Sequence, residues 1–189
     1  STIEHSSIIV IVGKRGTGKS YLLKDLAWNL HKSGNYSVGL AMTPTDDVVA
    51  SFEEFLPKSF VYGEYSESRV NALMASQKKA WKKNKGKFAF LFLDDCLYDK
   101  KILTSLTMRN LFMNGRHKRI LLILIAQYAV DIPAAMRSQV DYIFACREPI
   151  LSNKERLYKQ FYGCFPNFNS FSTTMDRCTE NYSTLVFNG

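Results

Sequence analysis

The sequence predicts an α/β fold in which a mostly parallel sheet carries helices on both faces. Short apolar runs such as residues 8–13, 88–93 and 120–126 have the composition of strands that are buried on both faces. Segments with the helical spacing of apolar residues separate these runs, and strands that alternate with helices indicate parallel crossover units. The run 120–126 is far shorter than the about 20 residues that a membrane-spanning helix needs, so we interpret it as a buried strand that ends at Gln127.

Six strands are expected, each an apolar run bounded by turn-forming or polar residues. In chain order they are residues 8–13, 38–42, 59–62, 88–93, 120–126 and 142–146. The C-terminal stretch 171–187 is expected to form a β-hairpin with "TEN" (179–181) at its turn.

The helices are expected from capping signals and from the spacing of apolar residues. The first follows the glycine-rich stretch 13–20 and ends near Leu30, because "SGN" (33–35) supplies a C-cap and a turn. The polar stretch "TPTDD" can cap the second, and a stripe of apolar side chains marks the third as a core helix. The later helices are expected at 46–55, 67–83, 101–113, within the proline-started stretch 131–140, and at 153–162.

The length of 189 residues predicts one domain, with a nucleotide-binding core over about 1–150 and a C-terminal helix and hairpin over 151–189. The composition, 46% hydrophobic and 22% charged, is typical of a soluble globular protein, and no secretory segment is expected at the N-terminus. The four cysteines are far apart in sequence and form no C-x-x-C pair, which predicts reduced thiols rather than a zinc site or disulfides.

The net charge of +8 is concentrated in two places. "KKAWKKNKGK" (78–87) holds six lysines and no acid, and "RHKR" (116–119) adds three formal charges. Such clusters attract the phosphate backbone of nucleic acids, although a lysine run can equally be a solvated helix face.

The stretch "GKRGTGKS" (13–20) matches the phosphate-binding motif G-x-x-x-x-G-K-[ST] in its proper context, after a strand and before a helix. Its glycines let the backbone N–H groups turn inward toward phosphate oxygens, and the following helix adds its N-terminal dipole. Lys19 can reach the β- and γ-phosphates, and the Ser20 hydroxyl can bind Mg²⁺. The residues expected to contact the nucleotide are Gly13, Lys14, Arg15, Gly16, Thr17, Gly18, Lys19, Ser20 and Tyr21.

Two acids follow the apolar run 88–93. Asp94 is expected to hold Mg²⁺ through a water molecule, opposite Ser20, and Asp95 to act on the attacking water, which favours hydrolysis over transfer to a substrate. An N-cap role for Asp95 is the alternative. If strand 120–126 lies between the first strand and strand 88–93, Gln127 reaches the γ-phosphate, where its amide can donate to phosphate and accept from water.

Three arginines are candidates for the group that meets charge developing on the γ-phosphate, often from a neighbouring subunit. Arg116 and Arg137 are expected near the phosphate-side ends of their strands, and Arg15 lies inside the glycine-rich loop. For each arginine taken singly, contact with a DNA backbone or no specific role is an equal alternative.

With "GKRGTGKS", "LFLDDCLYDK", "LFMNGRHKRILLILIAQYAVDIPAAMRSQVDYIF" and "LYKQFYGCF" in this order, the chain resembles the genome-packaging ATPases of the nucleocytoplasmic large DNA viruses, a branch of the FtsK–HerA superfamily. The resemblance covers about residues 8–187, and the block around "NGRH" and "AQY" is its most specific part. It implies a P-loop fold with an additional strand, a strand order near 5-1-4-3-2 and a C-terminal β addition. It also implies Walker A residues at Gly13, Gly18, Lys19 and Ser20, a Walker B pair at Asp94 and Asp95, and a polar sensor at Gln127.

The implied activity is Mg²⁺-dependent ATP hydrolysis that drives double-stranded viral DNA into a preformed capsid. The implied partners are DNA, capsid or inner-membrane proteins at the packaging vertex, and copies of the chain in a pentameric or hexameric ring. The implied location is the host cytoplasm at sites of viral assembly, and the virion. Two alternatives stay open on the residues alone: a nucleoside or nucleotide kinase, and an ATP-gated DNA-binding assembly factor with little turnover.

Overall fold

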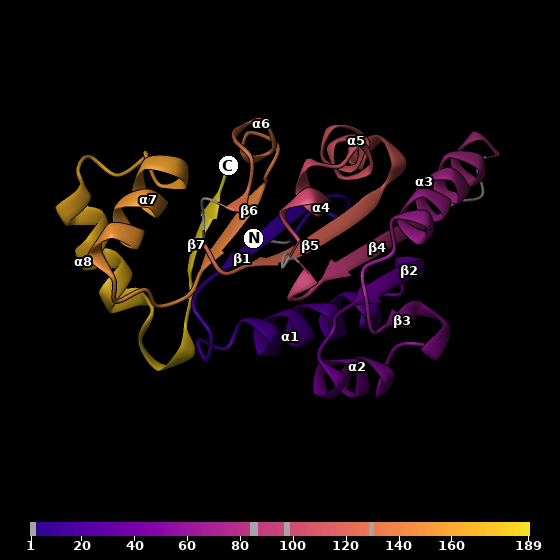
Figure 1. The fold of residues 1–189 in the computed structure, drawn as a ribbon, viewed down its shortest axis with the longest axis horizontal. Coiled ribbons are helices and arrows are strands. Elements are labelled where there is room, and N and C mark those ends of the chain that lie inside the picture. Colours follow the sequence, from indigo (N-terminus) through magenta and orange to yellow (C-terminus); the bar gives the residue numbers. More distant parts are fainter. Residues whose placement is uncertain (1–2, 84–86, 97–98, 129–130) are drawn as a thin grey trace.

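The computed structural model describes residues 3–83, 87–96, 99–128 and 131–189, and its centre is one sheet in the order β3-β2-β4-β5-β1-β6-β7 (Figure 1). All neighbouring strands are parallel except β6 and β7, which are antiparallel. The strands are β1 Ile8–Val12, β2 Tyr36–Met42, β3 Val61–Tyr62, β4 Phe88–Leu93, β5 Ile120–Ala126, β6 Tyr142–Ala145 and β7 Leu185–Asn188. The predicted α/β class and the position of the additional strand β5, between β1 and β4, are confirmed.

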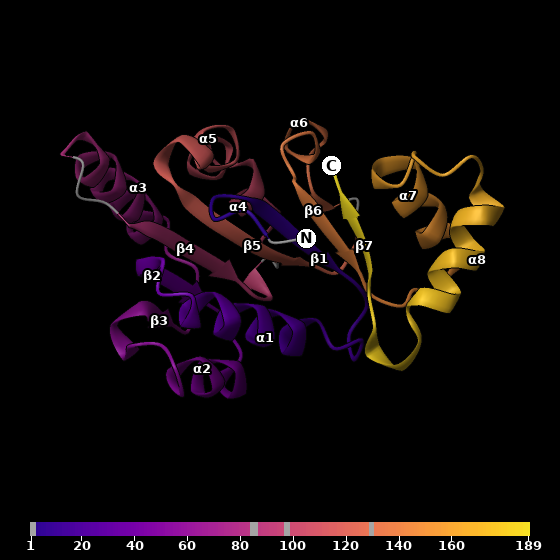
Figure 2. The ribbon, with the colours of Figure 1, turned by 180° about the vertical axis from the view of Figure 1, so that it is seen from behind.

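Helices cover both faces of the sheet (Figures 1 and 2). One face carries α1 (Lys19–Lys32) and α2 (Asp46–Glu53), and the other carries α3 (Glu67–Lys82), α4 (Lys100–Thr104), α5 (Leu106–Asn114) and α6 (Ala134–Arg137). Helices α7 (Leu151–Phe161) and α8 (Phe168–Cys178) form the end of the molecule beside β6 and β7. Short 3-10 helices are η1 (Lys58–Phe60), η3 (Arg116–Lys118) and η5 (Glu180–Tyr182).

The central strands are buried on both faces because successive side chains point to opposite sides of a strand. In β1, Ile8, Val10 and Val12 pack in the core beneath α3, α5 and α6. Ile9 and Ile11 pack in the second core, beneath α1 and α2. All seven residues of β5 are buried, as its unbroken apolar sequence predicts. None of the helices within the described ranges has the length and apolar character of a membrane-spanning segment.

Two element predictions need correction. The expected C-terminal antiparallel strand pair exists, between β6 and β7, but residues 171–178 form most of α8 rather than the first arm of a hairpin. The Asn167 side chain begins α8 by accepting a hydrogen bond from the backbone N–H of Ser170 at 2.9 Å. The helix expected at 101–113 is two helices, because Ser105 has extended backbone and its hydroxyl caps α5.

Candidate active site

The glycine-rich loop 13–18 joins β1 to α1 at the carboxyl ends of the parallel strands, where ligands bind in open α/β sheets. Gly16 and Gly18 have φ angles of 80° and 86°, in the left-handed region that side chains disfavour. A Cβ on Gly13 would lie 2.7 Å from both Cys146 Cβ and Thr17 Oγ1, so the start of the loop has no room for a side chain. The sequence therefore has glycine where the backbone needs it.

Lys19 is directed back into this loop by α1. Its Nζ donates a hydrogen bond of 2.7 Å to the carbonyl of Lys14, which also accepts from the Thr17 hydroxyl at 2.8 Å. Burial lowers the pKa of Lys19, and the carboxylates of Asp94 and Asp95 act in the opposite direction. A cation in this partly desolvated position attracts an anion such as phosphate more strongly than a lysine in water does.

Asp94, directly after β4, is only 3% exposed. Burial raises the pKa of its carboxyl group, with Asp95 adding to the rise, whereas a hydrogen bond from Ser20 and the charge of Lys19 lower the pKa. A buried carboxylate beside a hydroxyl suits Mg²⁺, which binds proteins through one or two side chains and takes its other ligands from water and phosphate. Within the described residues, no three His, Cys, Asp or Glu side chains form a metal cluster. A metal ion bound at Asp94 would therefore take most of its ligands from water and from a bound phosphate.

Asp95 and Gln127 come together from the ends of two neighbouring strands. The Gln127 Nε2 lies 3.4 Å from Asp95 Oδ1, a long hydrogen bond between two exposed side chains. Asp95 itself has a φ of 52°, which is uncommon outside glycine and turns its backbone sharply after β4. The placement expected from the sequence, Gln127 beside the double aspartate, is therefore present in the structure, while the roles of the two side chains stay predictions.

These side chains line one cavity of about 500 Å³. Its lining residues are Arg15, Gly16, Gly18, Lys19, Ser20, Tyr21, Thr45, Val48, Asp94, Asp95, Ile125 and Gln127. Sequence reasoning missed Thr45 and Val48, at the start of α2. Their position in the sequence could have indicated them. "TPTDD" (43–47) directly follows β2, and the strands of a parallel sheet end at the same edge, so this segment lies at the edge that holds the site.

The placement expected for Arg116 and Arg137 is wrong. Arg116 lies in η3, before β5 begins, and pairs with Asp141, the residue before β6. Helix α6 lies beside the start of β6 (Figure 1). Arg137 is its last residue and donates a hydrogen bond of 2.7 Å to the carbonyl of Ile132. Both therefore lie toward the amino ends of the strands, and of the three candidate arginines only Arg15 lines the cavity.

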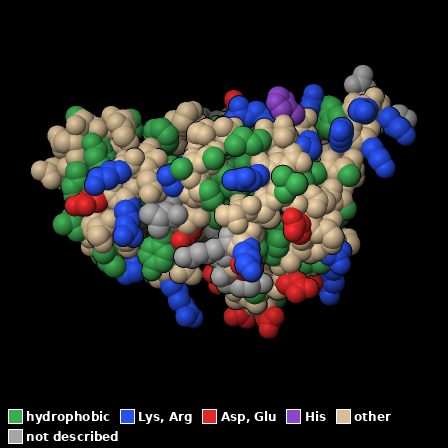
Figure 3. Space-filling view, turned by 45° about the horizontal axis from the view of Figure 1, so that its top comes forward, with side chains coloured by type: hydrophobic (Ala, Val, Ile, Leu, Met, Phe, Trp, Pro, Cys, Tyr) green, Lys and Arg blue, Asp and Glu red, His purple; other side chains and the backbone are tan. Residues whose placement is uncertain are grey.

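The two basic stretches of the sequence form one surface at this amino edge, here called the basic face. It comprises Lys78, Lys79 and Lys82 of α3, the C-cap residue Lys83, and Arg116, His117, Lys118 and Arg119. Figure 3 shows Lys and Arg side chains gathered over the end of α3. The buried Gln77 amide joins the two stretches by donating to the carbonyls of Lys87 at 3.2 Å and Arg119 at 3.4 Å. Lys85, in the same run, lies outside the described residues.

Packing and repulsion both act on the basic face. The Arg119 guanidinium lies 3.2 Å from the centre of the Trp81 ring, a cation–π contact that holds the start of β5 to α3. Burial lowers the pKa of Lys118, and the nearby charge of Lys78 lowers it further. The surface thus holds like charges close enough to repel, which a polyanion would relieve.

The four cysteines are free in the structure. Cys96 and Cys146 are buried beside the site, and burial raises the pKa of the Cys96 thiol to about 12. A thiol with such a pKa is protonated at neutral pH and is a weak nucleophile. We therefore assign the buried cysteines to packing.

The chain is similar in structure to viral packaging enzymes and to a bacterial ATPase. The genome packaging NTPase B204 from Sulfolobus turreted icosahedral virus 2, in complex with ATPγS, matches with a TM-score of 0.69 at 18% identity. That match covers 98% of this chain and 93% of B204. ATPases 2 and 3 of EssC from Geobacillus thermodenitrificans match with a TM-score of 0.67 at 13% identity, over 97% of this chain and 38% of that one. At these identities the likeness establishes a shared fold.

The chain has sequence relatives among viral proteins. Protein 075L of Invertebrate iridescent virus 6 is 37% identical over 180 residues, which are 95% of this chain and 69% of that protein. Protein L437 of Acanthamoeba polyphaga mimivirus is 29% identical over 188 residues, which cover 94% of this chain and 65% of L437. The family described as Poxvirus A32 protein matches residues 1–161. The resemblance to viral packaging proteins is thereby confirmed, and the chain belongs to the poxvirus A32 protein family.

Proposed function

We propose that the chain is an ATP-hydrolysing motor subunit that moves double-stranded viral DNA into a capsid. The observation that carries the proposal is the convergence of Lys19, Ser20, Asp94, Asp95 and Gln127 on one cavity at the carboxyl edge of the sheet. The names of the structural neighbours, a genome packaging NTPase bound to ATPγS and a DNA-packaging ATPase, support the same assignment.

The site's residues divide the work of hydrolysis. Lys19 exchanges its bond to the Lys14 carbonyl for phosphate oxygens, while the backbone N–H groups of the loop bind the β-phosphate. Ser20 and Asp94 would hold Mg²⁺, which neutralises charge on the phosphates. Asp95 orients the attacking water and accepts its proton. Gln127, beside Asp95, contacts both the water and the γ-phosphate and so senses whether that phosphate is present.

The basic face supports DNA as the polymer that is moved. Its lysines and arginines come from two segments that Gln77 holds together, and their mutual repulsion favours a polyanionic partner. The net charge of +8 adds a general attraction to nucleic acid. Hydrolysis would thus occur at one edge of the sheet and DNA contact at the other, with β4 and β5 connecting the two edges.

We further propose a ring in which a neighbouring subunit completes each site. Of the three candidate arginines, Arg15 lines the cavity of its own chain. Arg116 and Arg137 lie at the opposite edge of the sheet. Either of these two would therefore act only on another subunit, where an arginine can stabilise the transition state of phosphoryl transfer. Capsid or inner-membrane proteins remain the expected docking partners of such a ring.

The test is the release of inorganic phosphate from ATP at several protein concentrations, with and without double-stranded DNA. The proposal predicts that turnover per chain rises steeply with protein concentration, because assembly completes the site, and rises further with DNA. Turnover per chain that stays constant over the whole concentration range would contradict the ring-completed site. Consumption of ATP that needs an added nucleoside or nucleotide acceptor, and that releases no inorganic phosphate, would instead identify a kinase.

A further inference from the structure

Tyr182 is an exposed aromatic residue that lies against the phosphate-binding loop. A Cβ built on Gly18 would lie 3.3 Å from Tyr182 Cδ1, so the ring packs beside the residue that caps α1. Yet Tyr182 is 79% exposed, so the tyrosine contributes little to the hydrophobic core. The sequence motif gave no reason to expect an aromatic ring from residue 182 beside residue 18.

The topology of the sheet brings this distant residue to the loop. Leu185, the first residue of β7, pairs with Ala145 of β6, which in turn pairs with Val12, the last residue of β1. Because β7 runs antiparallel to its one neighbour, β6, it begins at the edge where β6 and β1 end. The Tyr162 hydroxyl fixes that beginning by donating to the carbonyl of Leu185 at 2.9 Å.

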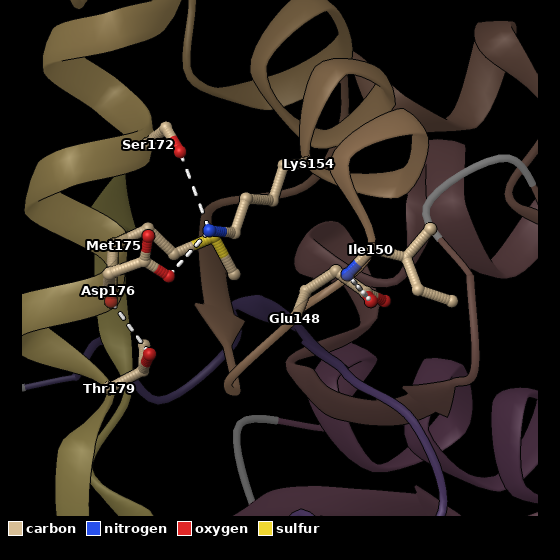
Figure 4. A network of polar contacts seen from close by, with 7 residues as sticks. All are labelled: Glu148, Ile150, Lys154, Ser172, Met175, Asp176 and Thr179. Atoms are coloured by element: carbon tan, nitrogen blue, oxygen red, sulfur yellow. Dashed lines mark hydrogen bonds and ion pairs between the residues drawn. The ribbon is translucent and has the colours of Figure 1, made fainter.

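The backbone is held in an unfavourable conformation to place the ring there. Asn181 and Tyr182 have φ angles of 50° and 61°, which lie in the left-handed region. Two consecutive residues in this region are rare, and a bulky residue such as tyrosine is seldom found there. The turn is anchored by a hydrogen bond of 3.0 Å from Ser183 N–H to the Glu180 carbonyl. Figure 4 shows the second anchor, in which the Thr179 hydroxyl donates to the carbonyl of Met175 at 2.7 Å. Such strain, with the ring left in water, points to a role outside folding.

The direction in which a bound nucleotide would extend indicates what this role is. This inference rests on the proposed function. Asp95 and Gln127 place the γ-phosphate at the ends of β4 and β5. The α-phosphate and the nucleoside then extend from the loop away from β4 and β5, which in the strand order is toward β6 and β7. Tyr182 is the exposed aromatic side chain that the segment before β7 contributes on that side.

We propose that the Tyr182 ring is the platform on which the base of the nucleoside triphosphate stacks. Every base has a flat π-face, and stacking on an aromatic side chain needs no hydrogen-bonding edge. The tail that carries β7 thereby becomes part of the nucleotide site. The ring also covers Gly18, so a bound base would lie beside the loop that holds its phosphates.

The test compares two probes by calorimetry: the non-hydrolysable analogue AMPPCP, which carries a base, and inorganic tripolyphosphate, which has none. Tyr182→Ala is expected to weaken AMPPCP binding about 5- to 100-fold and to leave tripolyphosphate binding unchanged. Tyr182→Phe, which keeps the ring, is expected to bind both probes like the wild type. Val186→Ala, an exposed change on β7 beyond the ring, is the matched control.

Unchanged AMPPCP binding by Tyr182→Ala would overturn the proposal, and so would an equal loss of both probes, because that result would mean that the ring only shapes the loop. A Tyr182→Gly variant separates folding from binding. Glycine accepts the left-handed backbone, so its melting temperature should not fall while its AMPPCP affinity does. A wild-type protein that binds AMPPCP but never hydrolyses ATP would overturn the motor and leave the stacking intact, because this test reads binding alone.

Discussion

At the scale of single residues, the two carboxylates after β4 are neighbours in sequence but lie in different surroundings. Asp94 is buried beside Ser20 and Lys19, whereas Asp95 is exposed and lies beside Gln127. A buried carboxylate suits a cation ligand, and an exposed one can exchange protons with water. One dipeptide thus supplies two different functions because one side chain is buried and the next is not.

Burial of Asp94 predicts a gain in stability when its charge is removed. The pKa of Asp94 is raised in the folded state, so folding is most favourable below the unfolded value of 3.8 and loses stability as the pH rises through the folded value. Asp94→Asn should therefore raise the thermal unfolding temperature of the nucleotide-free protein at pH ~7 and change it little at pH ~3. The exposed Asp25→Asn serves as the control, and a less stable Asn variant at neutral pH would contradict the assignment.

Gln127 is expected to act in hydrolysis rather than in nucleotide binding. Gln127→Ala should lower turnover by about 10- to 100-fold with little change in AMPPCP affinity, because the amide contacts the reacting end only. Steady-state phosphate release together with calorimetry measures both quantities. Gln139→Ala changes a glutamine outside the cavity and should behave like the wild type. If Gln127→Ala hydrolyses ATP normally, the residue is simply the end of a strand.

At this scale, residues with a local signature were predictable and others were not. The glycines of the loop, Lys19 and the double aspartate are recognisable because phosphate and metal chemistry fixes residue type and spacing along the chain. Tyr182 and Val48 reach the site from separate segments, with no fixed spacing to the motif. Only the folded topology reveals them.

At the scale of elements, α8 shows how local composition can mislead. The threonine residues of 171–184 favour a strand, but Phe168, Phe171 and Met175 have the spacing of one helix face. Phe171 and Met175 are fully buried in the core beneath α7 and α8, so packing decided in favour of the helix. By contrast, the apolar runs of β4 and β5 were predicted to the residue, because six or seven consecutive apolar residues bounded by polar ones are typical of a strand buried on both faces.

The contact between α7 and α8 contains a buried charge, and its two partners should respond unequally to mutation. Lys154 is 6% exposed and pairs with the half-exposed Asp176, with the Ser172 hydroxyl 3.4 Å from its Nζ (Figure 4). Asp176→Ala leaves the buried ammonium group without its counter-ion and should cost about 1–3 kcal/mol of unfolding free energy.

Lys154→Met keeps the length of the side chain and removes the charge, so it should cost less than Asp176→Ala does. Urea unfolding of both variants measures the difference. A Lys154→Met variant that is the less stable of the two would show that the ion pair itself, rather than the avoidance of a lone buried charge, stabilises the contact.

At the scale of the whole molecule, the parallel sheet separates two functions to opposite edges. The family resemblance implies a strand order near 5-1-4-3-2, which corresponds here to β6-β1-β5-β4-β2. Strands β3 and β7 extend this sheet at its two ends. The placement of Arg116 could have been predicted correctly from the sequence. "NGRH" (114–117) directly precedes the apolar run 120–126, so Arg116 adjoins the amino end of β5 and not its carboxyl end.

The basic face predicts salt-dependent DNA binding. Replacing Lys79 and Lys83 by glutamate should weaken binding to double-stranded DNA and flatten the log–log dependence of affinity on salt by about 0.9 for each phosphate that is no longer neutralised. Fluorescence anisotropy at several salt concentrations measures both effects. Lys159→Glu, on α7, makes the same change of charge per residue outside the basic face. If it weakens binding as much per charge, DNA responds to net charge and the basic face has no special part.

The central claim, that this site hydrolyses ATP with Asp95 acting on the water, is tested most directly by Asp95→Asn. The variant keeps the size and exposure of the side chain but removes its capacity to accept a proton. Phosphate release should fall about 10²- to 10⁴-fold, while AMPPCP affinity stays near that of the wild type. Equal rates in the two proteins would contradict the claim: if both are near zero, the chain is a nucleotide-binding module, and if both are high, another group activates the water.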